Sequence, residues 1–168
     1  NGARIGNNCK IFPGAIISAE SQDLKYNGEY AITEIGDNTT IREYVTIHKG
    51  TLDKKTTKIG SNCLLMSYVH VAHDCIIGNN VKLYQGVTLG AKSFPLDESG
   101  NLVKGIPRHP IVEDEVIIYS GATILGRVTI GKKAEIGGNV WLTRDIAPGT
   151  KIVQSKAQET FYEGGLGI

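Results

Sequence analysis

The hydrophobic residues of this chain recur every six positions, and this period predicts the architecture. An Ile, Leu or Val opens eighteen of nineteen hexads, and the nineteenth opens at Pro148. An amphipathic helix repeats at about 3.6 residues and a half-buried strand at about two, so neither explains the pattern. A short, fixed period over this length is typical of a solenoid. The aliphatic openers are Ile5, Ile11, Ile17, Ile35, Ile41, Ile47, Ile59, Leu65, Val71, Ile77, Leu83, Leu89, Val112, Ile118, Ile124, Ile130, Ile136 and Leu142.

Six nearly extended residues span about 20 Å, which suits one side of a triangular coil whose neighbours stack about 4.8 Å away. The first and fifth residues of each hexad then point inward. The fourth is Gly, Asn or Asp in eleven of nineteen hexads, and these residues tolerate the positive φ of a tight corner. The pattern predicts an all-β fold, a parallel β-helix of about six triangular coils with loop insertions. The corner residues are Asn8, Gly14, Asn38, Gly50, Asn62, Asp74, Asn80, Gly86, Gly121, Asn139 and Asp145.

Three interruptions and a tail depart from the period. We expect loops over residues 23–34, 53–58 and 95–111, and a Gly-rich tail over 154–168. Loops carry functional residues more often than scaffold positions do. Candidate chemistry is therefore sought near these insertions.

Composition excludes several classes of function. The formal charge is +1 and no basic stripe appears, so nucleic acid is not expected as a partner. No apolar run approaches the ~20 residues that cross a bilayer, so membrane insertion is not expected. Cys9, Cys63 and Cys75 all occupy the fifth hexad position, where burial explains them. An odd number of unpaired thiols suits the cytoplasm.

Residues 1–80 resemble the UDP-N-acetylglucosamine acyltransferases of lipid A synthesis. The resemblance is carried by the segments 22–26 (QDLKY), 41–51 (IREYVTIHKGT) and 64–75 (LLMSYVHVAHDC). Steric rules favour right-handed crossovers, whereas this resemblance implies a left-handed coil. It also implies that His73 is the general base that deprotonates a sugar hydroxyl for attack on an acyl thioester. By the same resemblance, the residues expected to contact substrate are Gln22, Asp23, Lys25, His48, His70 and Asp74.

Coil phase supports the grouping of these histidines. Counted from the first opener of each coil, His48 lies at phase 13, and His70 and His73 lie at phases 11 and 14 of the next coil. The three should therefore lie near one edge. Alternatives remain open: Asp74 suits a corner in any case, and His48 and His70 would also fit a solvated surface.

Residues 81–168 are similar instead to serine O-acetyltransferases, through the segments 84–90 (YQGVTLG), 108–110 (RHP), 122–126 (ATILG) and 136–141 (IGGNVW). The resemblance implies that Arg108 binds the amino acid carboxylate and that His109 assists the serine hydroxyl. An ordering role at the loop end is the alternative. That family also has an Asp-His pair one coil earlier, where this chain carries Leu64 and Leu65.

The two resemblances meet near residues 77–81 without a slip in hexad phase, which indicates a hybrid of two acyltransferases. The expected units are residues 1–80, a continuous second portion over 81–153, and the tail. His73 and His109 share nearly the same phase, so they are expected one or two coils apart along one edge. A composite site is a hypothesis.

Three functions remain open, since each parental site is incomplete and the helical domains of both families are not expected in this sequence. The favoured one is an engineered, weak or inactive scaffold that assembles as a homotrimer. The alternative is a working CoA-dependent O-acetyltransferase that uses His109, and a weaker third reading is a structural module. Acetyl-CoA or an acyl carrier protein thioester would be a co-substrate, and an acyl-CoA or nucleotide-sugar a ligand.

We expect no metal, because the near pair His70 and His73 lacks further ligands and Cys75 points inward.

Overall fold

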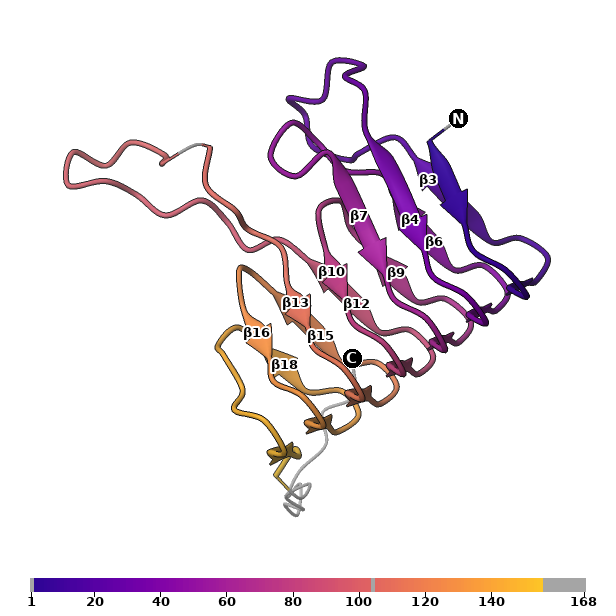
Figure 1. Ribbon diagram of the computed structural model, residues 1–168. Coiled ribbons are helices and arrows are strands. Elements are labelled where there is room, and N and C mark those ends of the chain that lie inside the picture. The colour runs from indigo at the N-terminus through magenta and orange to yellow at the C-terminus, as the bar shows by residue number, and fades with distance from the viewer. Residues whose placement is uncertain (1, 104, 156–168) are drawn as a thin grey trace, which may run out of the picture.

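The computed structural model describes residues 2–103 and 105–155 and consists of coils stacked along one axis (Figure 1). Each of six complete coils contributes one short strand to each of three parallel sheets, and β19 begins a further turn. The all-β fold with about six coils is therefore confirmed. No helix in these two ranges could cross a bilayer. Most of the expected tail, residues 156–168, lies outside the described residues.

The three sheets follow the three sides of the coil. The first contains β1 (Ala3–Ile5), β4 (Ile32–Ile35), β7 (Thr56–Ile59), β10 (Ile76–Ile77), β13 (Ile111–Val112) and β16 (Thr129–Ile130). The second contains β2 (Lys10–Ile11), β5 (Thr40–Ile41), β8 (Leu64–Leu65), β11 (Lys82–Leu83), β14 (Ile117–Ile118), β17 (Glu135–Ile136) and β19 (Lys151–Ile152). The third contains β3 (Ile16–Ala19), β6 (Thr46–His48), β9 (His70–Val71), β12 (Thr88–Gly90), β15 (Thr123–Leu125) and β18 (Trp141–Leu142).

The core is a column of stacked hexad openers. Every opener from Ile35 to Leu142 is buried, most of them completely. In the first coil, by contrast, Ile5 and Ile11 are each 44% exposed, and Cys9 is only partly buried. Cys63 and Cys75 are buried as predicted, whereas Cys9, in the first described coil, is only partly buried.

The corners use positive φ largely as predicted. Nine of the eleven predicted corner residues have it, and the exceptions are Gly50 and Asp145. Gly50 is required for a different reason: an added Cβ would lie 2.3 Å from the Thr56 nitrogen. Tyr44 and Tyr68 also adopt φ of 57° and 65° at the fourth position, and their rings stack with centroids 5.4 Å apart.

All three insertions leave the same edge of the β-helix, between the third sheet and the first. They connect β3 to β4, β6 to β7 and β12 to β13, and the last forms the long arm in Figure 1. Two strands begin earlier than predicted, since β4 starts at Ile32 and β7 at Thr56. Between β9 and β10 the connection is only the short turn 72–75. A short corner flanked by longer loops creates a recess at this edge.

Strand pairing continues through the region where the two sequence resemblances meet. In each sheet the strand of the fourth coil pairs in parallel with the strands before and after it: β10 with β7 and β13, β11 with β8 and β14, and β12 with β9 and β15.

Candidate functional site

The recess at the loop-bearing edge contains two adjoining pockets, of about 170 Å³ and about 490 Å³. Both are lined by His73, His109 and Arg108, together with Phe94. All nine residues proposed from the sequence line one or both pockets: Gln22, Asp23, Lys25, His48, His70, His73, Asp74, Arg108 and His109. The coil therefore gathers the nine residues at one edge, and for the four histidines this agrees with their shared phase.

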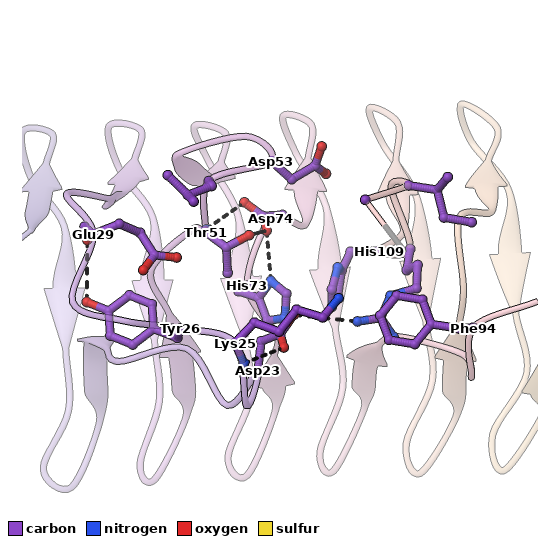
Figure 2. Close-up of a pocket in the computed structure, with 14 residues that line it drawn as sticks. Asp23, Lys25, Tyr26, Glu29, Thr51, Asp53, His73, Asp74, Phe94 and His109 are labelled. Carbon is purple, nitrogen blue, oxygen red and sulfur yellow. Dashed lines mark hydrogen bonds and ion pairs between the residues drawn. The ribbon is translucent and has the colours of Figure 1, made fainter. Parts of the chain in front are cut away.

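His73 and Asp74 form a hydrogen-bonded pair in the turn between β9 and β10 (Figure 2). The His73 Nδ1 lies 2.7 Å from the Asp74 Oδ2, and both residues are buried. An ionised carboxylate only accepts hydrogen bonds, so Nδ1 carries the proton that it donates. The neutral ring then has its free lone pair on Nε2. This tautomer suits a general base.

Thr51 holds the carboxylate of Asp74 from the loop between β6 and β7. Its backbone N–H donates to Oδ1 at 2.9 Å and its hydroxyl donates to Oδ2 at 2.5 Å. The backbone N–H of Asp74 in turn donates to the Thr57 hydroxyl at 2.8 Å. Burial alone would raise the pKa of Asp74, but the hydrogen bonds from His73 and Thr51 outweigh it and hold the pKa below its usual value. Asp74 thus stays ionised and fixes the His73 ring.

His109 lies directly against His73, at the end of the long arm that precedes β13. The two ring centroids are 3.9 Å apart with an interplanar angle of 56°. Burial, followed by the neighbouring His73, lowers the pKa of His109 from its ordinary value near 6.5 to about 3. Arg127 fixes the backbone here by donating to the His109 carbonyl at 3.3 Å. His109 is therefore a neutral ring and a weak base.

A cluster of charged residues and one aromatic ring joins two of the insertions over the pocket. The guanidinium carbon of Arg108 lies 3.7 Å from the Phe94 ring centroid, and the Lys25 Nζ lies 4.3 Å from it. Arg108 also pairs with Asp23 at 3.6 Å and donates to the Lys92 carbonyl at 3.1 Å. These contacts place two cations beside the histidines.

His48 and His70 form a second histidine pair, in the larger pocket. Their ring centroids are 5.3 Å apart in an edge-on arrangement. The His48 Nδ1 lies 2.5 Å from the Glu20 carbonyl oxygen, and the His70 Nδ1 lies 2.8 Å from the Thr46 hydroxyl. Burial, and then the charge of His48, lowers the pKa of His70. A fully solvated position is excluded for His48, which is 8% exposed.

Three contacts of the site were not predicted from the sequence. The histidines pair as His48 with His70 and His73 with His109, whereas the expected near pair was His70 with His73. As a result, His73, Asp74 and His109 present three potential metal ligand atoms within 4.8 Å of one another. Thr51 belongs to a motif noted in the sequence, but its bond to Asp74 depends on how the loop folds. Phe94 is not one of the hexad openers, so its contact with Arg108 was not predicted from the sequence.

Comparison with known proteins points to two kinds of relative. Residues 56–91 match the family described as bacterial transferase hexapeptide (six repeats). A serine acetyltransferase of Synechococcus elongatus is 54% identical over 100 residues, which are 60% of this chain and 31% of that protein. The acyl-(acyl-carrier-protein)–UDP-N-acetylglucosamine O-acyltransferase of Gloeothece citriformis is 37% identical over 148 residues, 88% of this chain and 48% of that protein.

A solved structure shows the same fold over most of the chain. The UDP-N-acetylglucosamine acyltransferase of Bacteroides fragilis aligns with a TM-score of 0.76 and 39% identity, over 88% of this chain and 51% of that one. The chain thus spans about half the length of the UDP-N-acetylglucosamine acyltransferases that it matches, and less of the serine acetyltransferase. The chain contains hexapeptide repeats folded into a left-handed parallel β-helix, and its sequence is similar both to UDP-N-acetylglucosamine acyltransferases and to serine acetyltransferases.

Proposed function

We propose that this protein is a hybrid hexapeptide-repeat scaffold that retains slow O-acyl transfer, with His73 as the general base. The observation that carries the proposal is the 2.7 Å hydrogen bond between His73 and the buried carboxylate of Asp74 beside the two pockets. A base oriented by a carboxylate is the arrangement that activates hydroxyl groups in acyl transfer.

In the proposed reaction, the Nε2 of His73 accepts the proton of a substrate hydroxyl as its oxygen attacks the carbonyl carbon of an acyl thioester. The C–O bond forms, and the tetrahedral intermediate then collapses with cleavage of the C–S bond. The imidazolium returns the proton to the departing thiolate, so atoms and charge balance. Asp74 stabilises the imidazolium and keeps the ring in the correct tautomer.

The substrates proposed are those of the relatives. An acyl carrier protein thioester or acetyl-CoA would supply the acyl group, and UDP-N-acetylglucosamine or serine the hydroxyl. Lys25 and Arg108 lie beside the histidines and suit an anionic group of either acceptor, a diphosphate or a carboxylate. Arg108 must exchange its 3.6 Å contact with Asp23 for such a ligand. We therefore expect weak binding of the acceptor.

Serine acetylation with His109 as the base is a second candidate, favoured by the 54% identity to a serine acetyltransferase. Its chemistry is less well supported. The pKa of His109 is lowered to about 3 by burial, so this ring accepts a proton poorly at neutral pH. The Asp-His pair of that family is replaced by Leu64 and Leu65, and Leu65 is completely buried in the core. His73 is then the better base for either acceptor.

Thiol release tests the proposal with two substrate pairs, acetyl-CoA with serine and an acyl-(acyl carrier protein) with UDP-N-acetylglucosamine. We expect His73→Gln to abolish turnover and Asp74→Asn to reduce kcat by about 10²- to 10⁴-fold, because an amide favours the wrong tautomer of the ring. Asp145→Asn is the matched control, since Asp145 accepts a backbone N–H at a distant corner. Turnover that survives in His73→Gln but is lost in His109→Gln would contradict the assignment.

We also propose that the protein assembles as a homotrimer. The three flat sheet faces of the coil support threefold packing. Light scattering under native conditions tests this, and a monomeric mass would contradict it.

A further inference from the structure

We propose that His73, His109 and Asp74 together bind one divalent transition-metal ion of the Zn²⁺ class. The ligand atoms of the three residues lie within 4.8 Å of one another, and all three residues are buried. Two neutral imidazoles and one carboxylate form a ligand set that Zn²⁺ accepts, with a fourth position left for water. Acyl transfer requires only the pair of His73 and Asp74, so it does not explain why His109 completes this group.

The distances require only small movements. Tetrahedral Zn²⁺ with ligand bonds of about 2.0–2.2 Å places neighbouring ligand atoms about 3.4 Å apart. The His73 Nδ1 and the Asp74 Oδ2 are closer than this, at 2.7 Å. The group as a whole is wider, at up to 4.8 Å. Small rotations of the two histidine rings, which move their ligand nitrogens by roughly an ångström, would bring the ligand atoms to the spacing that a Zn²⁺ ion requires.

Residues outside the ligand set already hold the ligands in place. Thr51 donates two hydrogen bonds to the Asp74 carboxylate, and Arg127 donates to the backbone carbonyl of His109. Such supporting contacts orient metal ligands, and their loss typically weakens binding by about 10- to 100-fold. The burial of all three ligands also limits competition from water.

The second histidine pair provides an internal comparison. His48 and His70 lie with centroids 5.3 Å apart, but no carboxylate joins them in a ligand group among the residues that the structure describes. The Nδ1 of each is also engaged, with the Glu20 carbonyl and the Thr46 hydroxyl respectively. A metal ion should therefore bind at His73 and His109 and not at His48 and His70.

Ligand chemistry, rather than nearby charge, selects the kind of ion. Arg108 lies in the same pocket, although it pairs with Asp23 at 3.6 Å, so its charge is partly neutralised. Mg²⁺ and Ca²⁺ prefer sets of oxygen ligands, whereas imidazole suits Zn²⁺, Ni²⁺ and Cu²⁺. We therefore expect binding of the second group of ions and no response to Mg²⁺.

Metal binding would also inhibit acyl transfer, a consequence that rests on the proposed function. Coordination through the Nε2 of His73 uses the lone pair that accepts the proton. Coordination through Nδ1 leaves the proton on Nε2, so the ring again cannot act as the base. In both cases Zn²⁺ acts as an inhibitor of the proposed reaction, and its removal with a chelator restores turnover.

Calorimetric titration of the full chain with Zn²⁺, and the visible spectrum with Co²⁺, test the site directly and without an activity assay. We expect one ion per chain, binding weakened at least tenfold in His109→Gln and in Asp74→Asn, and unchanged affinity in the matched control His48→Gln. Binding that persists unchanged in His109→Gln would overturn the proposal, as would the absence of binding at about 1 mM Zn²⁺, well above the range of protein zinc sites.

A measurement of the histidine ring resonances in the unsubstituted protein does not depend on whether the variants fold. The chain has four histidines, so their ring resonances can be followed individually during a Zn²⁺ titration. Shifts confined to His73 and His109 support the site, and shifts confined to His48 and His70 overturn it. If metal binds but no acyl transfer occurs, the proposed function fails while the metal site stands.

Discussion

Burial of a neutral His109 should make the stability of this protein depend strongly on pH between neutrality and mild acid. The residue is 4% exposed, and burial lowers its pKa from about 6.5 to about 3. The neighbouring His73 and Arg108 disfavour protonation further, while Asp74 and Asp23 oppose them. The folded protein therefore leaves His109 uncharged at pH values where the unfolded chain protonates it.

The sign and size of the effect follow from this difference in bound protons. Below pH 6.5 the unfolded state binds one more proton at His109, so the free energy of unfolding falls by about 1.4 kcal/mol for each pH unit. The contribution is complete above pH 6.5 and is lost progressively down to about pH 3. Between pH 7.5 and pH 4.5 the loss from this residue is about 2.7 kcal/mol.

Urea denaturation at pH 7.5 and pH 4.5, at one protein concentration and with a metal chelator, measures this loss. The pH dependence of the unsubstituted protein should exceed that of His109→Gln by about 2.7 kcal/mol. His70, whose pKa is also lowered, contributes to both proteins and cancels in the comparison. Equal pH dependence in the two proteins, within about 0.5 kcal/mol, would refute the buried neutral ring.

Three further substitutions test the scaffold and the pocket. Leu65→Ala removes a completely buried opener and should cost about 2–5 kcal/mol of unfolding free energy by urea denaturation. Gly50→Ala places a Cβ 2.3 Å from the Thr56 nitrogen, so we expect a loss of about 1–3 kcal/mol; unchanged stability would argue against this close approach. Phe94→Ala removes the ring beneath Arg108, so trypsin should cleave after Arg108 faster, with an unchanged rate as the contrary result.

The buried column was predictable because the inward direction depends only on position within the hexad. Ile41 and Ile130 lie far apart in the sequence, and both are completely buried. Ile5, in the first described coil, is more exposed than this rule predicts, at 44%. The residue types at the corners were less predictable than the corner positions. Positive φ was expected at Gly, Asn and Asp, but Tyr68 also adopts it, where its ring stacks on Tyr44.

The edge that carries the candidate site was predictable, but its contacts were not. Shared phase placed His48, His70 and His73 together, and all three line the larger pocket. The insertions have no period, however, so nothing in the pattern indicated that Phe94 would contact Arg108. The contact between His73 and His109 likewise depends on the path of the long arm, which brings the rings to 3.9 Å.

A coiled scaffold with a fixed period explains how His73 and His109, which come from different coils, share one edge. Each strand of the fourth coil pairs in register with both neighbours, so an unbroken hexad phase keeps every corner aligned. The alignment of His73 and His109 therefore requires no selection for joint catalysis. What distinguishes the two rings is their partners. His73 has the carboxylate of Asp74, whereas His109 has a buried position against another ring, which suits a ligand better than a base.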